Sequence, residues 1–186
     1  MIYYIHGFRS CALANEPKVL ELKKMFPSET VIGLDYDSFT SFDNIFNTLM
    51  GSIDPEADNF FIGTSLGAYY ARILAEETGS NCVLFNPLID PVDSLKPGMH
   101  INYCTGLRDF MNRATIESYY GVNFDLSISI PTTVFLSKND EVLNNNKARN
   151  LFKKFANIID IDEGHRINTF NPYAKEIIGT RNSRIL

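Results

Sequence analysis

The sequence of 186 residues lacks the features of several classes of protein. It has no apolar run near the roughly 20 residues that a membrane-spanning helix needs. No basic leader with a small-residue cleavage site precedes the apolar segment 2–5, so we expect a cytoplasmic protein without a membrane span. Lysine and arginine are also fewer than aspartate and glutamate, 17 against 22. The formal net charge of −5 argues against nucleic acid as a partner, because nucleic-acid binders usually display a basic face.

Cysteine is scarce as well. Cys11, Cys82 and Cys104 are odd in number, widely scattered and form no CxxC pair. This pattern predicts reduced thiols and no zinc site. We identify no other metal site and no cofactor site in the sequence, so we expect neither. The length suits one hydrophobic core, and residues 1–186 are predicted to form a single domain.

Short apolar runs alternate with segments of helical period, a pattern typical of a parallel sheet covered by helices. The predicted strands are 2–5, 31–34, 59–62, 82–85, 132–136 and 158–161. The predicted helices are 16–26, 42–50, 66–78, 147–155 and 172–178. The fold class is therefore α/β.

Residues 87–131 interrupt this alternation. They contain prolines, glycines and tyrosines, with only a modest helical signal around 109–120. An insertion of this length between two strands is often functional. Its aromatic and aliphatic side chains favour an ordered lid that covers a pocket and limits the length of a bound acyl chain. The alternative is that they complete the core.

A G-x-S-x-G motif at residues 63–67 is the strongest functional signal. A buried-strand run precedes it and a helix-period segment follows it directly. A serine at such a sharp turn takes a strained conformation and projects its hydroxyl from the sheet edge. Gly63 and Gly67 are needed because side chains there would collide with the neighbouring strand and helix. This context predicts Ser65 as a nucleophile; the alternative is a phosphate-binding turn or simple tight packing.

A serine hydroxyl needs a base to take its proton. In this architecture the triad follows the chain order serine, acid, histidine. His165 follows the last predicted strand and is therefore the predicted base. His100 lies in the insertion, ahead of every acid of the following strand, and His6 ends the first strand.

The acid is expected just after the strand that follows the insertion. Asp140 lies there, where a carboxylate can orient the imidazole and stabilise its charged form. The adjacent Glu141 remains an alternative. Asp160 and Asp162 are further alternatives, because they are closer in sequence to His165.

Residues 6–8 close the first strand, where a loop of this architecture donates one backbone N–H to the developing oxyanion. We expect the N–H groups of Phe8 and Leu66 to form this oxyanion hole. Gly7 would let the backbone approach the substrate, and His6 would shape the turn rather than carry protons. The alternative is a turn that only ends the strand.

Four segments together resemble the small bacterial esterases of the YqiA/YcfP type: YIHGF at 4–8, GTSLGAYYA at 63–71, FNP at 85–87 and NDEVL at 139–143. The segment YCTG at 103–106 is similar to a further family motif. The resemblance spans residues 3 to about 173, and the family's nucleophile, acid and base would fall on Ser65, Asp140 and His165. Asn139 and Gly164 depart from it, since the family usually has glycine and aspartate there.

This resemblance implies an α/β hydrolase with esterase activity on short acyl esters, extending to acyl-CoA. Together with the residue pattern, it predicts a minimal α/β-hydrolase fold: six mostly parallel strands in the spatial order 2-1-3-4-5-6, helices on both faces and a lid-like insertion. The predicted function is a serine hydrolase that cleaves short to medium acyl esters or thioesters through an acyl-enzyme intermediate. The alternative is a catalytically weak binding module on the same scaffold.

Overall fold

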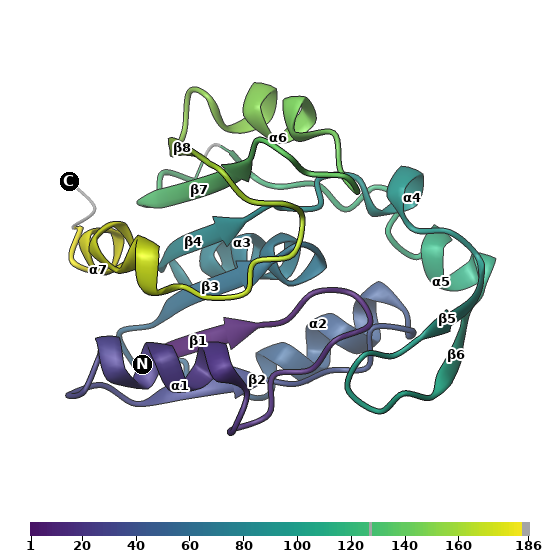
Figure 1. The fold of residues 1–186 in the computed structure, drawn as a ribbon, viewed down its shortest axis with the longest axis horizontal. Coiled ribbons are helices and arrows are strands. Elements are labelled where there is room, and N and C mark those ends of the chain that lie inside the picture. Colours follow the sequence, from purple (N-terminus) through teal and green to yellow (C-terminus); the bar gives the residue numbers. More distant parts are fainter. Residues whose placement is uncertain (127, 184–186) are drawn as a thin grey trace.

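The computed structural model describes residues 1–126 and 128–183, so Ser127 of the insertion and residues 184–186 lie outside it. Six parallel strands form the main sheet, in the order β2-β1-β3-β4-β7-β8 (Figure 1). This is the predicted spatial order. The strands are β1 (Ile2–Ile5), β2 (Val31–Leu34), β3 (Phe60–Thr64), β4 (Asn81–Phe85), β7 (Thr132–Ser137) and β8 (Asn157–Ile161).

Helices cover both faces of this sheet (Figure 1). Along β1, Ile2 and Tyr4 face one core cluster while Tyr3 and Ile5 face the other, as the two-residue period of a strand requires. The first cluster packs under α1 (Pro17–Met25) and α7 (Ala174–Arg181), and the second under α2 (Phe42–Met50), α3 (Leu66–Thr78) and α6 (Asn145–Phe152). A short 3-10 helix, η1 (Asn171–Tyr173), precedes α7.

The insertion contains the short helix α4 (Pro91–Ser94), an antiparallel hairpin of β5 (Gly98–Ile101) and β6 (Arg108–Met111), and the short helix α5 (Arg113–Glu117). The helical signal expected around 109–120 is therefore wrong over its first residues, which pair with β5 instead. The helix starts only after Asn112, whose side chain accepts the N–H of Thr115 at 2.7 Å.

The insertion divides into a buried and an exposed half. Met111, Ile116 and Tyr119 are buried in the core cluster on the α3 side. The hydroxyls of Tyr119 and Tyr70 are hydrogen-bonded at 2.7 Å, which joins the insertion to α3. The hairpin, in contrast, exposes large apolar side chains to solvent: Met99, Ile101, Leu107 and Phe110. One half of the insertion thus completes the core, as the alternative interpretation expected.

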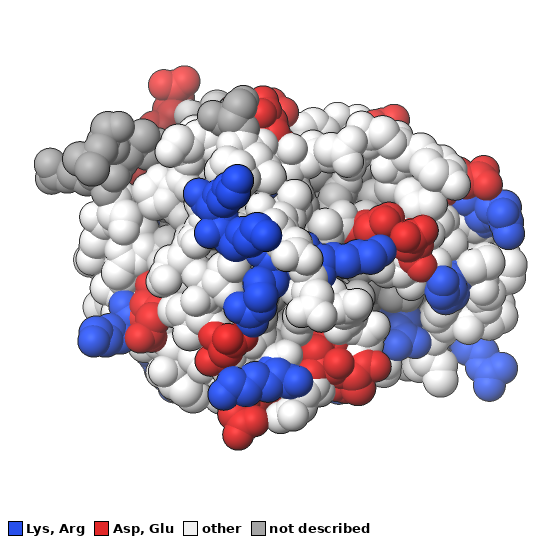
Figure 2. All heavy atoms as spheres, turned by 90° about the horizontal axis from the view of Figure 1, so that it is seen from above, with Lys and Arg blue, Asp and Glu red and all other residues white. Residues whose placement is uncertain are grey.

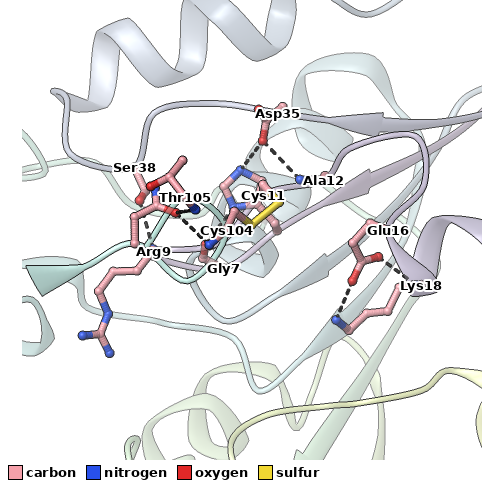
Figure 3. Close-up of a disulfide and its surroundings, with 12 residues drawn as sticks. Gly7, Arg9, Cys11, Ala12, Glu16, Lys18, Asp35, Ser38, Cys104 and Thr105 are labelled. Atoms are coloured by element: carbon pink, nitrogen blue, oxygen red, sulfur yellow. Dashed lines mark hydrogen bonds and ion pairs between the residues drawn. A yellow bond between two sulfur atoms is a disulfide. The ribbon is translucent and has the colours of Figure 1, made fainter. Parts of the chain in front are cut away.

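The predicted reduced state of the cysteines is wrong for two of the three. Cys11, in the loop after β1, forms a disulfide with Cys104 in the β5–β6 loop (Figure 3). These residues are separated by 93 positions in the sequence, and only the folding back of the hairpin brings them together. Beside the disulfide, the N–H of Tyr103 donates to the carbonyl of Arg9 at 2.8 Å. Cys82 is a buried free thiol.

The charged side chains of the face seen from above Figure 1 are of mixed sign (Figure 2). Lys147 of α6 lies within ion-pair distance of Asp90, which caps α4, and of Asp93, which lies within α4. These ion pairs link the insertion to α6. Among the residues that the structure describes, no helix is long and apolar enough to cross a membrane.

Replacing Cys11 by serine should lower the free energy of unfolding by about 2–4 kcal/mol, because the disulfide closes a long loop and restricts the unfolded chain. Urea unfolding of the variant and the wild type, each with and without dithiothreitol, measures this loss, and reductant should remove the difference. A thiol titration of the denatured, unreduced protein should find only Cys82. Detection of all three thiols would contradict the disulfide.

Tyr119 and Tyr120 provide a matched pair of substitutions in the insertion. Tyr119 is 2% exposed and Tyr120 is 68% exposed. Tyr119→Ala should lower the free energy of unfolding by about 3–5 kcal/mol, as other large aromatic truncations in cores do. Tyr120→Ala should change it by less than about 0.5 kcal/mol. Equal effects in thermal or urea unfolding would show that the insertion is not part of the core.

Candidate active site

Ser65 lies at the junction between β3 and α3. Its backbone has φ 55° and ψ −119°, a conformation that residues other than glycine rarely adopt. Backbone hydrogen bonds hold it there: the Ser65 N–H donates to the carbonyl of Phe85 at 2.9 Å, and the Ser65 carbonyl accepts the N–H of Leu88 at 3.2 Å. The turn thus fixes the nucleophile candidate at the carboxyl ends of β3 and β4.

Two glycines allow this turn to form against the neighbouring strand. A Cβ on Gly63 would lie 2.3 Å from the carbonyl oxygen of Gly67. A Cβ on Gly67 would lie 2.2 Å from the carbonyl oxygens of both Ile5 and His6. Any side chain at either position would therefore displace backbone, and this is the collision that the sequence predicts.

The structure brings Ser65, His165 and Asp140 together. The Ser65 Oγ lies 3.0 Å from Nε2 of His165. The Nδ1 of the same ring lies 2.9 and 3.1 Å from the two carboxylate oxygens of Asp140. With Nδ1–H donating to the carboxylate, the lone pair of Nε2 faces the serine hydroxyl. One ring nitrogen thus faces the serine hydroxyl and the other faces the carboxylate, which is the geometry of a Ser-His-Asp triad.

Asp140 is held as a carboxylate. Partial burial raises its pKa, but the hydrogen bonds from His165 and from the N–H groups of Leu143 and Val142 hold the pKa below its ordinary value. Asp140 is therefore ionised at neutral pH, where it can balance the charge of an imidazolium.

The alternative acids have other partners. The carboxylate of Glu141 accepts the backbone N–H of His165 at 2.9 Å, so it contacts the loop and not the ring. Asp160 forms an ion pair with Arg149. Asp162 accepts a hydrogen bond from Asn139 at 2.9 Å. Among the described carboxylates, only that of Asp140 is hydrogen-bonded to the imidazole.

The other two histidines lie away from this relay. The ring of His6 is buried, stacks on Tyr36 with centroids 4.2 Å apart, and places Nδ1 2.8 Å from the carbonyl of Gly7. His100 packs against the ring of Phe8 at 5.3 Å, and its Nε2 lies 2.8 Å from the carbonyl of Lys96. Neither ring is hydrogen-bonded to Ser65.

The loop after β1 lies beside the nucleophile. A Cβ added to Gly7 would lie only 3.3 Å from the Cβ of Ser65. Within residues 1–126 and 128–183, no acceptor binds the N–H of Phe8 or that of Leu66, the first residue of α3. Both groups are thus free to bind an oxygen, and the positive end of the α3 dipole favours a negative one.

Asn86 is a site residue to which sequence reasoning assigns no role. It is buried at φ 44° directly after β4. Its side chain accepts the N–H of Ser137 at 2.8 Å and donates to the carbonyl of His165 at 3.0 Å. Asn86 therefore ties the His165 loop to the ends of β4 and β7. The available signal was a polar residue between a buried strand and Pro87.

The structure shows no cluster of three or more histidine, cysteine or acidic side chains suited to a metal ion, within the part of the chain that it describes. The groups that meet at Ser65 are a hydroxyl, an imidazole and a carboxylate.

Comparison with known proteins identifies the family. The model of the uncharacterised protein family UPF0227 matches residues 1–181. The chain belongs to this family. The UPF0227 protein YcfP of Escherichia coli O9:H4 is 24% identical over 183 residues, covering 95% of this chain and 96% of that protein. The resemblance to YcfP is thereby confirmed.

Solved structures show the α/β-hydrolase fold. The mouse alpha/beta hydrolase domain-containing protein 10 superposes with a TM-score of 0.68 at 14% identity, over 96% of this chain and 86% of that one. The monoacylglycerol lipase of Paleococcus ferrophilus superposes with a TM-score of 0.67 at 12% identity, over 96% and 92%. The UPF0227 chain thus has the predicted fold class.

Substitution of His165 and of His100 should have different effects on kcat for ester hydrolysis. His165→Ala should reduce kcat by several orders of magnitude, because Ser65 loses its base. His100→Ala, the control, should leave kcat nearly unchanged, since its ring contacts Phe8 and not Ser65.

The pH profile of the wild type provides a second reading of the same experiment. Hydrogen bonds hold the pKa of Asp140 below the ordinary aspartate value of about 3.9, so this carboxylate stays ionised at all higher pH values. Protonation of Asp140 should therefore cause no loss of activity above about pH 4. An inactive His100→Ala, or a wild type in which Asp140 is protonated above about pH 4, would contradict the assignment.

Proposed function

We propose that this UPF0227 protein is a serine hydrolase that cleaves acyl esters, with Ser65 as nucleophile, His165 as general base and acid, and Asp140 as the orienting carboxylate. The observation that carries the proposal is the continuous relay from the Ser65 hydroxyl through the imidazole to the carboxylate, with separations of 3.0 and 2.9 Å. The lipase and hydrolase-domain neighbours share the fold and are consistent with it.

In the first half-reaction, Ser65 Oγ attacks the carbonyl carbon while Nε2 of His165 takes its proton. The electron pair of the carbonyl moves to oxygen, and the N–H groups of Phe8 and Leu66 stabilise this oxyanion. Each such donor typically contributes about 3 kcal/mol to the transition state. When the tetrahedral intermediate collapses, the alcohol or thiol leaves with the proton from His165, and the acyl group remains on Ser65.

In the second half-reaction, water attacks the acyl-enzyme. His165 takes a proton from this water and returns it to Ser65 Oγ as the carboxylic acid leaves. Asp140 stabilises the imidazolium in both steps and remains ionised throughout. His6, Gly7, Gly63 and Gly67 act by shaping the two turns that hold the reacting groups.

A catalytically weak binding module on the same scaffold is the competing proposal. The geometry favours the enzyme, because a binding protein has no physical need for a base aligned on a strained serine. The strain at Ser65 costs of order 1–3 kcal/mol, and such strain is concentrated at functional sites.

We further propose a small-molecule substrate with a short to medium acyl chain, joined as an ester or a thioester. The insertion offers limited material for a deep tunnel, and its hairpin carries the His100 ring that contacts Phe8. The Cys11–Cys104 disulfide opposes the cytoplasmic location expected from the sequence, since disulfides persist mainly in oxidising compartments.

Ser65→Ala should fold as the wild type does and lose nearly all turnover of 4-nitrophenyl butyrate, by several orders of magnitude. A fluorophosphonate probe should label the wild type at Ser65 and leave the variant unlabelled. Ser10→Ala, a change of a serine in the neighbouring loop, serves as the matched control and should keep both activity and labelling. Unchanged activity of Ser65→Ala would refute the mechanism, and an unlabelled wild type without turnover would favour the binding module.

A further inference from the structure

Two arginine side chains meet at one aromatic ring beside the relay. The guanidinium carbon of Arg9 lies 4.7 Å from the ring centroid of Tyr103, and that of Arg166 lies 5.4 Å from the same centroid. Arg9 also donates to the Tyr103 hydroxyl at 2.7 Å. Cations are attracted to the face of an aromatic ring, so both charges are held in contact with the same ring.

Neither cation is neutralised. In the described part of the chain, no carboxylate forms an ion pair with Arg9 or Arg166. Glu141 binds the backbone N–H of His165 instead. The guanidinium of Arg9 points away from Asp35 and Glu16 in Figure 3. The Nε of Arg9 is moreover buried without a hydrogen-bond partner. A buried, unsatisfied donor is uncommon and calls for a missing partner.

The position of the two arginines in the chain links them to the reacting groups. Arg9 directly follows Phe8, whose N–H we assign to the oxyanion hole, and Arg166 directly follows His165. Tyr103, which both arginines contact, is fixed by its backbone hydrogen bond to Arg9 and by the adjacent Cys11–Cys104 disulfide. Each positive charge thus belongs to the residue that directly follows, in the sequence, the proposed oxyanion donor or the proposed base.

Both guanidinium groups contact the same ring and neither is paired with a described carboxylate, so both can bind an added anion. Guanidinium groups bind carboxylate and phosphate through paired, charge-assisted hydrogen bonds. We infer that Arg9 and Arg166 form a binding site for an anionic group, a carboxylate or a phosphate, on the substrate of Ser65. This inference rests on the proposed hydrolase function and adds the class of substrate: an ester or thioester that carries a negative charge away from the scissile bond.

The anion can belong to either part of the substrate, and two matched pairs of substrates distinguish them. The mono-4-nitrophenyl ester of succinate carries a carboxylate on the acyl part, and 4-nitrophenyl butyrate is its neutral counterpart. Butyryl-CoA carries phosphates on the leaving group, and S-butyryl-N-acetylcysteamine is its neutral counterpart. The wild type should prefer the anionic member of one pair by about 10-fold or more in kcat/KM, the effect expected of a hydrogen-bonded charge.

Arg9→Met and Arg166→Met should each lower kcat/KM for that anionic substrate by about 10-fold, and should change it for the neutral counterpart by less than about twofold. Arg9→Lys should restore part of the loss, because lysine keeps the charge but not the planar fork. Arg113→Met is the control, since Arg113 is an exposed arginine of the insertion that also carries Tyr103, and it is paired with Glu117. It should leave both substrates of each pair unaffected.

The outcomes separate this inference from the proposed function. Suppose that the neutral esters are cleaved by a reaction that depends on Ser65. If neither pair then shows a preference, or if the arginine variants slow both members of a pair equally, the anion site is refuted. The proposed hydrolase function is unaffected by that result. If no ester is cleaved, calorimetry of succinate and coenzyme A with Ser65→Ala protein decides. Binding that disappears in the Ser65→Ala, Arg9→Met double variant supports the anion site alone, and absence of binding refutes it.

Discussion

Helix α3 lies in direct backbone contact with β1, and the geometry of the whole site depends on this contact. Gly67 brings the helix against the carbonyls of Ile5 and His6, where no side chain would fit. The turn that carries Ser65 and the loop that carries Phe8 are consequently fixed to one another. The N–H groups of Phe8 and Leu66 and the hydroxyl of Ser65 are therefore held in fixed positions relative to one another by this contact.

The side chains of Asp140 and His165 reach Ser65 from the other half of the sheet. Asp140 follows β7 and His165 follows β8, so their loops must be held across β4 to meet Ser65. Asn86 provides that connection, because its side chain bonds both the end of β7 and the carbonyl of His165. The insertion is fastened separately, to α3 through Tyr119 and to the loop after β1 through Cys104. The Ser65 turn, the His165 loop and the insertion are thus each held by a different set of contacts.

The sequence predicts those parts of the structure that local patterns determine. The strand and helix around Ser65 and the helix α2 follow from periodicity and glycine placement, and the order of the sheet follows from the fold that the family resemblance implies. Contacts between distant residues could not be predicted in this way. Nothing near Cys11 indicates a partner 93 positions away, and Asn86 is recognisable as a clamp only once β7 lies beside β4. The hairpin was missed because β5 and β6 are largely exposed and lack the buried apolar run that marks a strand such as β1.

The chain contains nine tyrosines and no tryptophan, so tyrosine dominates its ultraviolet absorption and fluorescence. Tyr70 and Tyr119 share a hydrogen bond at the seam between α3 and the insertion, and burial raises the pKa of Tyr119 to about 12. Chiral, immobile packing of these rings gives a near-ultraviolet circular dichroism signal. The docking of the insertion onto the sheet can therefore be followed optically in the unlabelled protein, with no tryptophan emission to obscure it.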